Sequence, residues 1–330
     1  MRHIIFTNTV IYIVMALLCL PRAPALAAGP AGYHLYVARF SEGDVAVLDS
    51  ATHKEVGRIV MGFGSNPVEV IPSPDKSLLY VSNRGRDEIA VVDVKSGKIT
   101  ARIKTGVHPH FMNFTPDGRY LVVANNQDEK ATVIDPFTNA VVGSPAEGRG
   151  ASGVAITDDS AYAYITSIYD DEISVIDLKK MERVRIIHAR GAMAIMIPRK
   201  SRFAYLCTNR DRVSVLDIAS GEIVGSIPAG NTPNYITLSS DGVRAFVTNA
   251  LSKTLSVMDL EKRTLIKEIP VGTEPTSSAL SPDGKYLFVN NHSGGATDGS
   301  ISVIDTGSLK EVDRIEFWRN PRAMAVLPAR

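Results

Sequence analysis

The chain has 330 residues, of which 45% are hydrophobic and 22% charged, so it can bury a large core and is neither disordered nor collagen-like. Lys and Arg total 36 against 35 Asp and Glu, and the formal net charge at pH 7 is +1. A chain so nearly balanced lacks the basic excess of proteins that coat nucleic acid, so we expect no nucleic-acid partner.

The first 27 residues have the organisation of a secretory signal peptide. A basic start precedes an apolar run at residues 10–20, and Ala25-Leu-Ala27 has the small-residue form that signal peptidase recognises. The apolar run is shorter than the roughly 20 residues of a membrane-spanning helix, so we expect cleavage, with a retained anchor as the alternative. Residues 28–330 would then be periplasmic or secreted, without stable membrane insertion.

One short pattern, apolar-x-Val-apolar-Asp, returns seven times along the chain. Its aspartates are 44, 42, 42, 40, 42 and 46 residues apart. Intervals of this length are typical of the four-stranded blade of a β-propeller. The copies end at Asp49, Asp93, Asp135, Asp177, Asp217, Asp259 and Asp305.

Each repeat unit reads as four short strands, and the second unit shows all of them. Apolar runs occupy residues 68–71, 79–83, 89–93 and 99–103, and the turn Pro72-Ser-Pro-Asp75 separates the first two. Similar turns recur in later units, most of them with Pro-Asp-Gly. Because Pro fixes φ and Gly accepts positive φ, we assign these residues to turn geometry and not to catalysis.

The ends of the mature chain predict how the ring closes. The chain begins with a strand of the second type at residues 35–38 and finishes with a strand of the first type at residues 323–327. Pairing them in one sheet would remove the open edge. We therefore predict an all-β fold in which residues 28–330 form a single closed seven-bladed β-propeller, and we expect a monomer.

Several second strands end in a shared sequence, seen as Tyr80-Val-Ser-Asn83, Phe246-Val-Thr-Asn249 and Val122-Val-Ala-Asn125. Over essentially all of the mature chain the sequence resembles the YVTN repeat family of exported β-propellers. The resemblance implies the fold strongly and the function weakly, because similar repeats occur in proteins with no known activity and in proteins associated with redox cofactors. The pattern departs at Tyr36-Val-Ala-Arg39 and Tyr164-Ile-Thr-Ser167.

The sequence is also similar, more weakly, to the haem d1 propeller domain of cytochrome cd1 nitrite reductases and to exported proteins of d1 assembly. In those proteins a histidine and several basic residues meet an anionic tetrapyrrole, and the resemblance implies the same class of ligand here. The chain departs from the reductase domain in having seven repeats where that domain has eight blades. It also lacks a Cys-x-x-Cys-His motif for covalent haem c.

Arginine predominates over lysine in the loops that join second to third strands and one blade to the next. These connections share one face of a propeller, which we call the top face. The guanidinium fork suits bidentate binding of carboxylate or phosphate, so we predict a site for an anionic cofactor or a partner protein. Pairing with nearby acidic residues is the alternative. The candidates are Arg39, Arg84, Arg86, Arg149, Arg190, Arg210, Arg319 and Arg322.

Four histidines, His108, His110, His188 and His292, are also expected on the top face. Imidazole binds transition metals or haem iron, so these residues are candidates for metal or haem contact, although their spacing is no specific metal motif. Side chains alternate along a strand, so at most one of His108 and His110 should face the channel directly. The cofactor stays undetermined between a tetrapyrrole and a transition metal.

These features together favour an exported binding or assembly module that holds a partner protein or an anionic cofactor on its top face. The alternative is an enzyme or cofactor-maturation protein that acts on a tetrapyrrole or another small exported substrate. We find no Gly-x-Ser-x-Gly motif, and the sequence assigns no catalytic residue.

Overall fold

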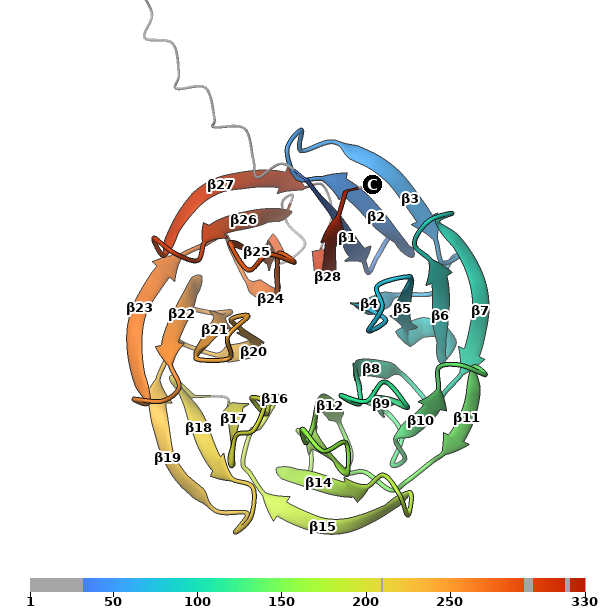
Figure 1. Cartoon of the computed structure of the whole chain (residues 1–330), viewed down its shortest axis with the longest axis vertical. Coiled ribbons are helices and arrows are strands. Elements are labelled where there is room, and N and C mark those ends of the chain that lie inside the picture. Colours follow the sequence, from blue (N-terminus) through green and yellow to red (C-terminus); the bar gives the residue numbers. More distant parts are fainter. Residues whose placement is uncertain (1–31, 209, 294–298, 318–320, 330) are drawn as a thin grey trace, which may run out of the picture.

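The computed structural model describes residues 32–208, 210–293, 299–317 and 321–329. They form a ring of seven antiparallel four-stranded sheets around a central opening (Figure 1). One strand of each sheet lines the opening and the fourth lies on the outer rim. The expected seven-bladed propeller is confirmed, whereas the expected signal peptide lies outside the described residues.

In each blade the strands follow one another from the central opening to the outer rim. Blade 1 contains β28 (Pro321–Pro328), β1 (Tyr33–Arg39), β2 (Asp44–Asp49) and β3 (Glu55–Val60). Blade 2 contains β4 (Pro67–Pro72), β5 (Leu78–Asn83), β6 (Glu88–Asp93) and β7 (Lys98–Lys104). Blade 3 contains β8 (Pro109–Phe114), β9 (Leu121–Asn125), β10 (Thr132–Asp135) and β11 (Ala140–Gly143). Blade 4 contains β12 (Ala151–Ile156), β13 (Tyr162–Ser167), β14 (Glu172–Asp177) and β15 (Glu182–His188).

The remaining blades follow the same order. Blade 5 contains β16 (Ala194–Met196), β17 (Phe203–Cys207), β18 (Arg212–Asp217) and β19 (Ile223–Pro228). Blade 6 contains β20 (Pro233–Leu238), β21 (Arg244–Asn249), β22 (Thr254–Asp259) and β23 (Thr264–Pro270). Blade 7 contains β24 (Pro275–Leu280), β25 (Tyr286–Asn291), β26 (Gly299–Asp305) and β27 (Lys310–Phe317). A 3-10 helix, η1 (Arg84–Arg86), follows β5. No described helix is long and apolar enough to cross a membrane.

Blade 1 joins the two ends of the described chain, as the order of the repeats predicts. β28 pairs antiparallel with β1, so that Tyr33 lies opposite Pro328 and Val37 opposite Met324. A second contact links blade 1 to blade 7, because Nε2 of His53 lies 2.8 Å from Oδ2 of Asp313 on β27. The ring is therefore closed by strand pairing and supported by a polar contact across the same seam.

The hydrophobic core is divided among the spaces between neighbouring blades. Seven apolar clusters lie among the described residues, one for each adjacent pair of blades. Between blades 1 and 2, for example, Val45 and Val47 pack with Leu79 and Val81. Successive side chains of a strand point to opposite faces, and each blade has a neighbour on both sides. The second strands are therefore almost continuously apolar, as sheets buried on both faces require.

The asparagine that ends several second strands is a structural residue. The Nδ2 of Asn249 donates hydrogen bonds to Oγ1 of Thr254 at 3.0 Å and to Oγ of Ser256 at 2.9 Å. Gly230 packs so closely that an added Cβ would lie 2.8 Å from Cγ of Asn249. The motif therefore joins the second and third strands and requires glycine in the connection between blades.

The repeat aspartates stabilise the turns between third and fourth strands. Oδ1 of Asp259 accepts a hydrogen bond from the Lys262 N–H at 2.8 Å, and Oδ1 of Asp305 accepts one from the Ser308 N–H at 2.6 Å. These backbone hydrogen bonds lower the pKa of both carboxyls, because they favour the charged form. The most regular residue of the repeat is thus accounted for by turn geometry.

Candidate functional site

A cluster of polar side chains from blades 1, 2, 3 and 7 lies where the inner strands begin on the top face, and we call it the channel mouth. The inner strands β28, β4, β8 and β24 of these blades are adjacent in the ring (Figure 1). Five members are candidates from the sequence and the sixth is Glu274. The channel mouth consists of Arg84, His108, His110, Glu274, His292 and Arg322.

Arg84 and His108 are in direct contact across blades 2 and 3. Nε of Arg84 donates a hydrogen bond to Nδ1 of His108 at 3.4 Å. His108 precedes β8 in the left-handed region, with φ of 57°, and its N–H donates to Oδ1 of Asp87 at 2.9 Å. Burial and then the Arg84 charge lower the pKa of His108. The imidazole is thus neutral and accepts a hydrogen bond from the guanidinium.

His110 lies one residue inside β8, and Arg322 lies one residue inside β28, so both belong to the same level of the ring. Nδ1 of His110 is 3.4 Å from Oγ of Ser152 on the neighbouring blade. Burial, followed by the charges of Arg84 and Arg322, lowers the pKa of His110 to about 3. This side chain is therefore neutral at physiological pH.

Arg322 is the cationic group with the least compensation at the mouth. Its guanidinium carbon lies 5.3 Å from the centre of the Phe40 ring, and its buried Nε has no hydrogen-bond partner in the described structure. Burial and the nearby Arg84 charge lower the pKa of Arg322, whereas Glu274 raises it. No carboxylate of the described residues lies within ion-pair distance of this guanidinium. The arrangement favours an added anion.

His292 follows β25 on blade 7 and contacts the sixth member of the mouth. Its Nδ1 lies 3.4 Å from Oε2 of Glu274, and its N–H donates to the Glu274 carbonyl oxygen at 3.0 Å. Burial and the Arg322 charge lower the pKa of His292, and Glu274 opposes them. Glu274 therefore orients this imidazole and supplies the nearest negative charge.

Two other predicted arginines that the structure describes are paired with carboxylates outside the mouth. Arg39 is buried and forms a bidentate ion pair with Asp44, with Nε–Oδ1 at 2.6 Å. Arg149 is also paired, because its Nε and Nη2 both donate to Oδ1 of Asp170, at 2.9 and 2.7 Å. These two cases follow the alternative in which arginines pair with nearby carboxylates.

The remaining candidates lie farther out or outside the described chain. Arg190, Arg210 and His188 are exposed, and His188 ends the outermost strand of blade 4. Arg319 lies outside the described residues. No group of three or more His, Cys, Asp or Glu side chains able to hold a metal occurs in the described parts of the chain.

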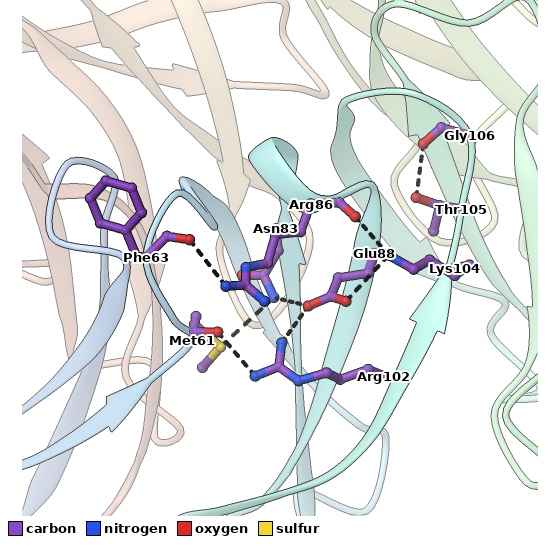
Figure 2. Close-up of polar contacts among 9 residues, drawn as sticks. All are labelled: Met61, Phe63, Asn83, Arg86, Glu88, Arg102, Lys104, Thr105 and Gly106. Carbon is purple, nitrogen blue, oxygen red and sulfur yellow. Dashed lines mark hydrogen bonds and ion pairs between the residues drawn. The ribbon is translucent and has the colours of Figure 1, made fainter.

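Arg86 helps to hold a top-face loop between blades 1 and 2 (Figure 2). Its Nη2 donates to the Phe63 carbonyl at 3.1 Å, and Arg102 donates to the Met61 carbonyl at 3.0 Å. Arg102 is itself paired with the buried Glu88. The loop presents the Phe63 ring with 99% of its surface exposed, so Arg86 supports an exposed aromatic residue beside the mouth.

Sequence reasoning missed the residues that lie deeper in the channel. Glu69 on β4 and Tyr235 on β20 both line an internal cavity of about 190 Å³, together with Phe111 on β8. The signal for Glu69 was a single charged residue inside the apolar run Val68-Glu-Val-Ile71. Tyr235 and Phe111 carried no signal, since aromatic residues are common in strands.

Comparison with known families places this chain among β-propeller sequences. A lactonase family with a seven-bladed β-propeller matches residues 61–138, and a YNCE-like β-propeller family matches residues 148–284. Each match covers less than half of the chain. No protein with a curated description matches the sequence significantly.

Solved structures give similar folds at low sequence identity. Hydrazine synthase of Kuenenia stuttgartiensis matches with a TM-score of 0.69 and 20% identity, covering 80% of this chain and 92% of that one. A functionally unknown protein of Desulfotomaculum acetoxidans matches with a TM-score of 0.75 and 16% identity, and the match covers 90% of this chain and 99% of that one. The dihydro-haem d1 dehydrogenase NirN, in complex with DHE, matches with a TM-score of 0.65 and 19% identity, and the match covers 91% of this chain and 66% of that one. These likenesses show a shared β-propeller fold.

Proposed function

We propose that this protein is an exported binding module whose channel mouth holds an anionic ligand, and that carboxylates of a tetrapyrrole are the class of anion that suits it. The observation that carries this proposal is the buried Nε of Arg322, which lacks a hydrogen-bond partner in the described structure. An anion between Arg322 and Arg84 would satisfy that donor and offset the repulsion between the two cations.

The residues of the mouth fit a tetrapyrrole in three respects. Arg84 and Arg322 would bind its carboxylates, and the Phe40 ring beside Arg322 offers an apolar face. The neutral imidazole of His292, whose Nδ1 faces Glu274, retains a lone pair on Nε2 for a central metal, because burial and the Arg322 charge lower its pKa. A bound metal tetrapyrrole would supply redox chemistry at its metal, whereas the chain's own residues hold and orient it.

The similarity to NirN supports this ligand class, because that protein was solved with DHE and shares the propeller fold. Export rests on the signal-like residues 1–27. A partner protein that presents acidic side chains would meet the same two guanidinium groups, and it is the other anionic ligand that the mouth suits.

One contact favours a second candidate, an enzyme or maturation protein that acts on a tetrapyrrole. The pairing of Glu274 with His292 at 3.4 Å orients an imidazole as a carboxylate orients a catalytic base. The lowered pKa of His292 suits proton acceptance and not donation at neutral pH. A His292→Ala variant that retains the ligand but loses turnover would favour the enzyme.

The binding proposal is tested by titrating the mature protein with iron protoporphyrin and following the Soret absorbance. We expect the double variant Arg84→Gln and Arg322→Gln to bind about a hundredfold or more weakly, because each of the two lost charge-assisted hydrogen bonds costs roughly 1.5–3 kcal/mol. The matched control is Lys95→Gln with Lys98→Gln, which removes two charges near the bottom turn of blade 2. Equal affinities of the two double variants would contradict the proposal.

A further inference from the structure

Below the channel mouth, the inner strands enclose a cavity of about 190 Å³ that no mouth residue lines. Its wall carries one charged side chain, Glu69, and two aromatic rings, Phe111 and Tyr235. Most of the other lining side chains are apolar. They include Ile71, Val154, Ile195, Met196 and Ile236. The cavity therefore combines a single carboxyl group with an apolar and aromatic wall.

The two rings separate the cavity from the mouth. β8 and β20 lie on opposite sides of the central opening (Figure 1). The Phe111 and Tyr235 rings nevertheless meet edge to face, with centroids 5.6 Å apart. They form a bridge one residue below the level of His110 and Arg322, so the cavity is a site distinct from the mouth.

Glu69 has no counter-charge in the described structure. Its side chain is buried, with 4% of the residue surface exposed, and Oε2 accepts a hydrogen bond from the Met112 N–H at 2.5 Å. Burial raises the pKa of Glu69 to about 8, and the Met112 hydrogen bond opposes that shift. A cation in the cavity would supply the missing charge.

A second cavity lies next to this site, on the side of the bottom face. It has a volume of about 280 Å³, shares Asn113 with the first cavity, and is lined by Pro74, Thr115 and Asp158 of the bottom turns. On this arrangement a small ligand would approach Glu69 from the face opposite the mouth, past Asn113.

We propose that this cavity binds a small organic ammonium ion, with Glu69 as its counter-ion and the Phe111 and Tyr235 rings against its alkyl groups. Aromatic rings attract cations, and recognition of alkylated ammonium groups by aromatic residues uses this attraction. A hydrated metal ion would instead seek several oxygen ligands, and only Glu69, Asn113 and Tyr235 bring side-chain oxygens to this lining. The volume equals that of about six water molecules, which suits an ion of a few heavy atoms.

The direct test is calorimetric titration with tetramethylammonium chloride, whose charge does not change with pH. We expect saturable binding, weakened about tenfold or more by Glu69→Gln, because the amide can still accept the Met112 N–H but carries no charge. Potassium chloride and uncharged tert-butanol should bind more weakly than tetramethylammonium. Glu268→Gln, which removes an exposed carboxylate on the outer strand β23, is the matched control and should leave the affinity unchanged.

The pH dependence gives a second readout that uses only the wild-type protein. The titratable or charged groups on the neighbouring inner strands are His110, Tyr235 and Arg322. The pKa of His110 is lowered to about 3, burial raises that of Tyr235, and Arg322 is a guanidinium, so Glu69 is the one of these groups that titrates near pH 8. Affinity should rise about tenfold per pH unit up to about pH 8. Affinity that is independent of pH, or equal for potassium and tetramethylammonium, would overturn the proposal.

The outcome is independent of the anion proposal. Loss of tetramethylammonium binding in Glu69→Gln leaves the Arg84 and Arg322 test unaffected, since no contact joins Glu69 to either arginine in the described structure. A folded Glu69→Gln protein with wild-type affinity would remove the cation site and leave the mouth as it stands.

Discussion

At the scale of single residues, the mouth keeps its imidazoles neutral by burying them, and nearby guanidinium groups add to that effect. Burial has the largest effect on the pKa of His110, and Arg84 and Arg322 lower it further. His292 also loses basicity through burial and Arg322, while Glu274 acts in the opposite direction. Removing the Arg322 charge should therefore change the basicity of two histidines on different blades.

We predict that Arg322→Gln raises the pKa of both His110 and His292, because a neutral amide no longer disfavours an imidazolium nearby. The measurement is a pH titration of the histidine ring protons by NMR in the wild-type and variant proteins. Lys95→Gln is the control and should leave both titrations unchanged. If neither histidine shifts in Arg322→Gln, the two side chains do not share the mouth with Arg322.

Residue identity alone does not distinguish the arginines of the mouth from those held in ion pairs. In the sequence, Arg39 resembles a free cation in a loop. In the structure it ends β1, whose neighbour β2 runs from Asp44 to Asp49. The register places Asp44 directly opposite Arg39, and the two side chains form a bidentate ion pair. Glu69 looks like an isolated exception in an apolar strand. The role of Glu69 depends on its height along the central channel. That height is set by the packing of inner strands that are distant in sequence.

At the scale of elements, each blade repeats the same aspartate turn, and these turns respond together to acid. Backbone or side-chain hydrogen bonds lower the pKa of the carboxyl in six of the turns. They are Asp49, Asp135, Asp177, Asp217, Asp259 and Asp305. In acid the unfolded chain therefore binds protons before the folded chain does. These carboxylates therefore stabilise the folded protein at pH values above the pKa that they have in the unfolded chain. This stabilisation is lost as the pH falls through their lower pKa in the folded protein.

We expect the thermal unfolding midpoint to fall as the pH decreases from about 4 to about 2, the range below the ordinary aspartate pKa. Differential scanning calorimetry across this range measures it. Asp259→Asn retains an oxygen that can accept the Lys262 N–H but carries no titrating charge, so its midpoint should depend less on pH. An acid response identical to that of the wild type would show that this turn does not contribute.

At the scale of the whole molecule, the ring depends on a strand from the C-terminal end of the chain. Removing residues 321–330 would expose the inner edge of β1 and remove the buried side chains of Met324, Val326 and Leu327. We expect a fall in melting temperature of roughly 10 °C or more. A chain shortened only by residues 329–330 keeps β28 and is the control, and equal melting of both shortened chains would contradict closure by β28.

The sequence predicted this architecture well, because the Asp spacing and the strand types at the two ends depend on local periodicity. It also predicted that five of the six mouth residues lie on the top face, because successive loops between strands alternate between the two faces of the ring. It did not identify which arginines are paired, or the channel cavity. Those features arise where separate blades meet, as with Phe111 and Tyr235, and no local pattern encodes that contact.

The central claim is that the channel mouth retains an anion, and native mass spectrometry of the mature protein purified gently from its own compartment tests it most directly. Arg84→Gln with Arg322→Gln should be prepared in parallel, with Lys95→Gln and Lys98→Gln as the control pair. We predict a reproducible added mass on the wild type and the control that is absent from the mouth variant. The same added mass on all three proteins, or a bare chain mass for the wild type, would contradict the account.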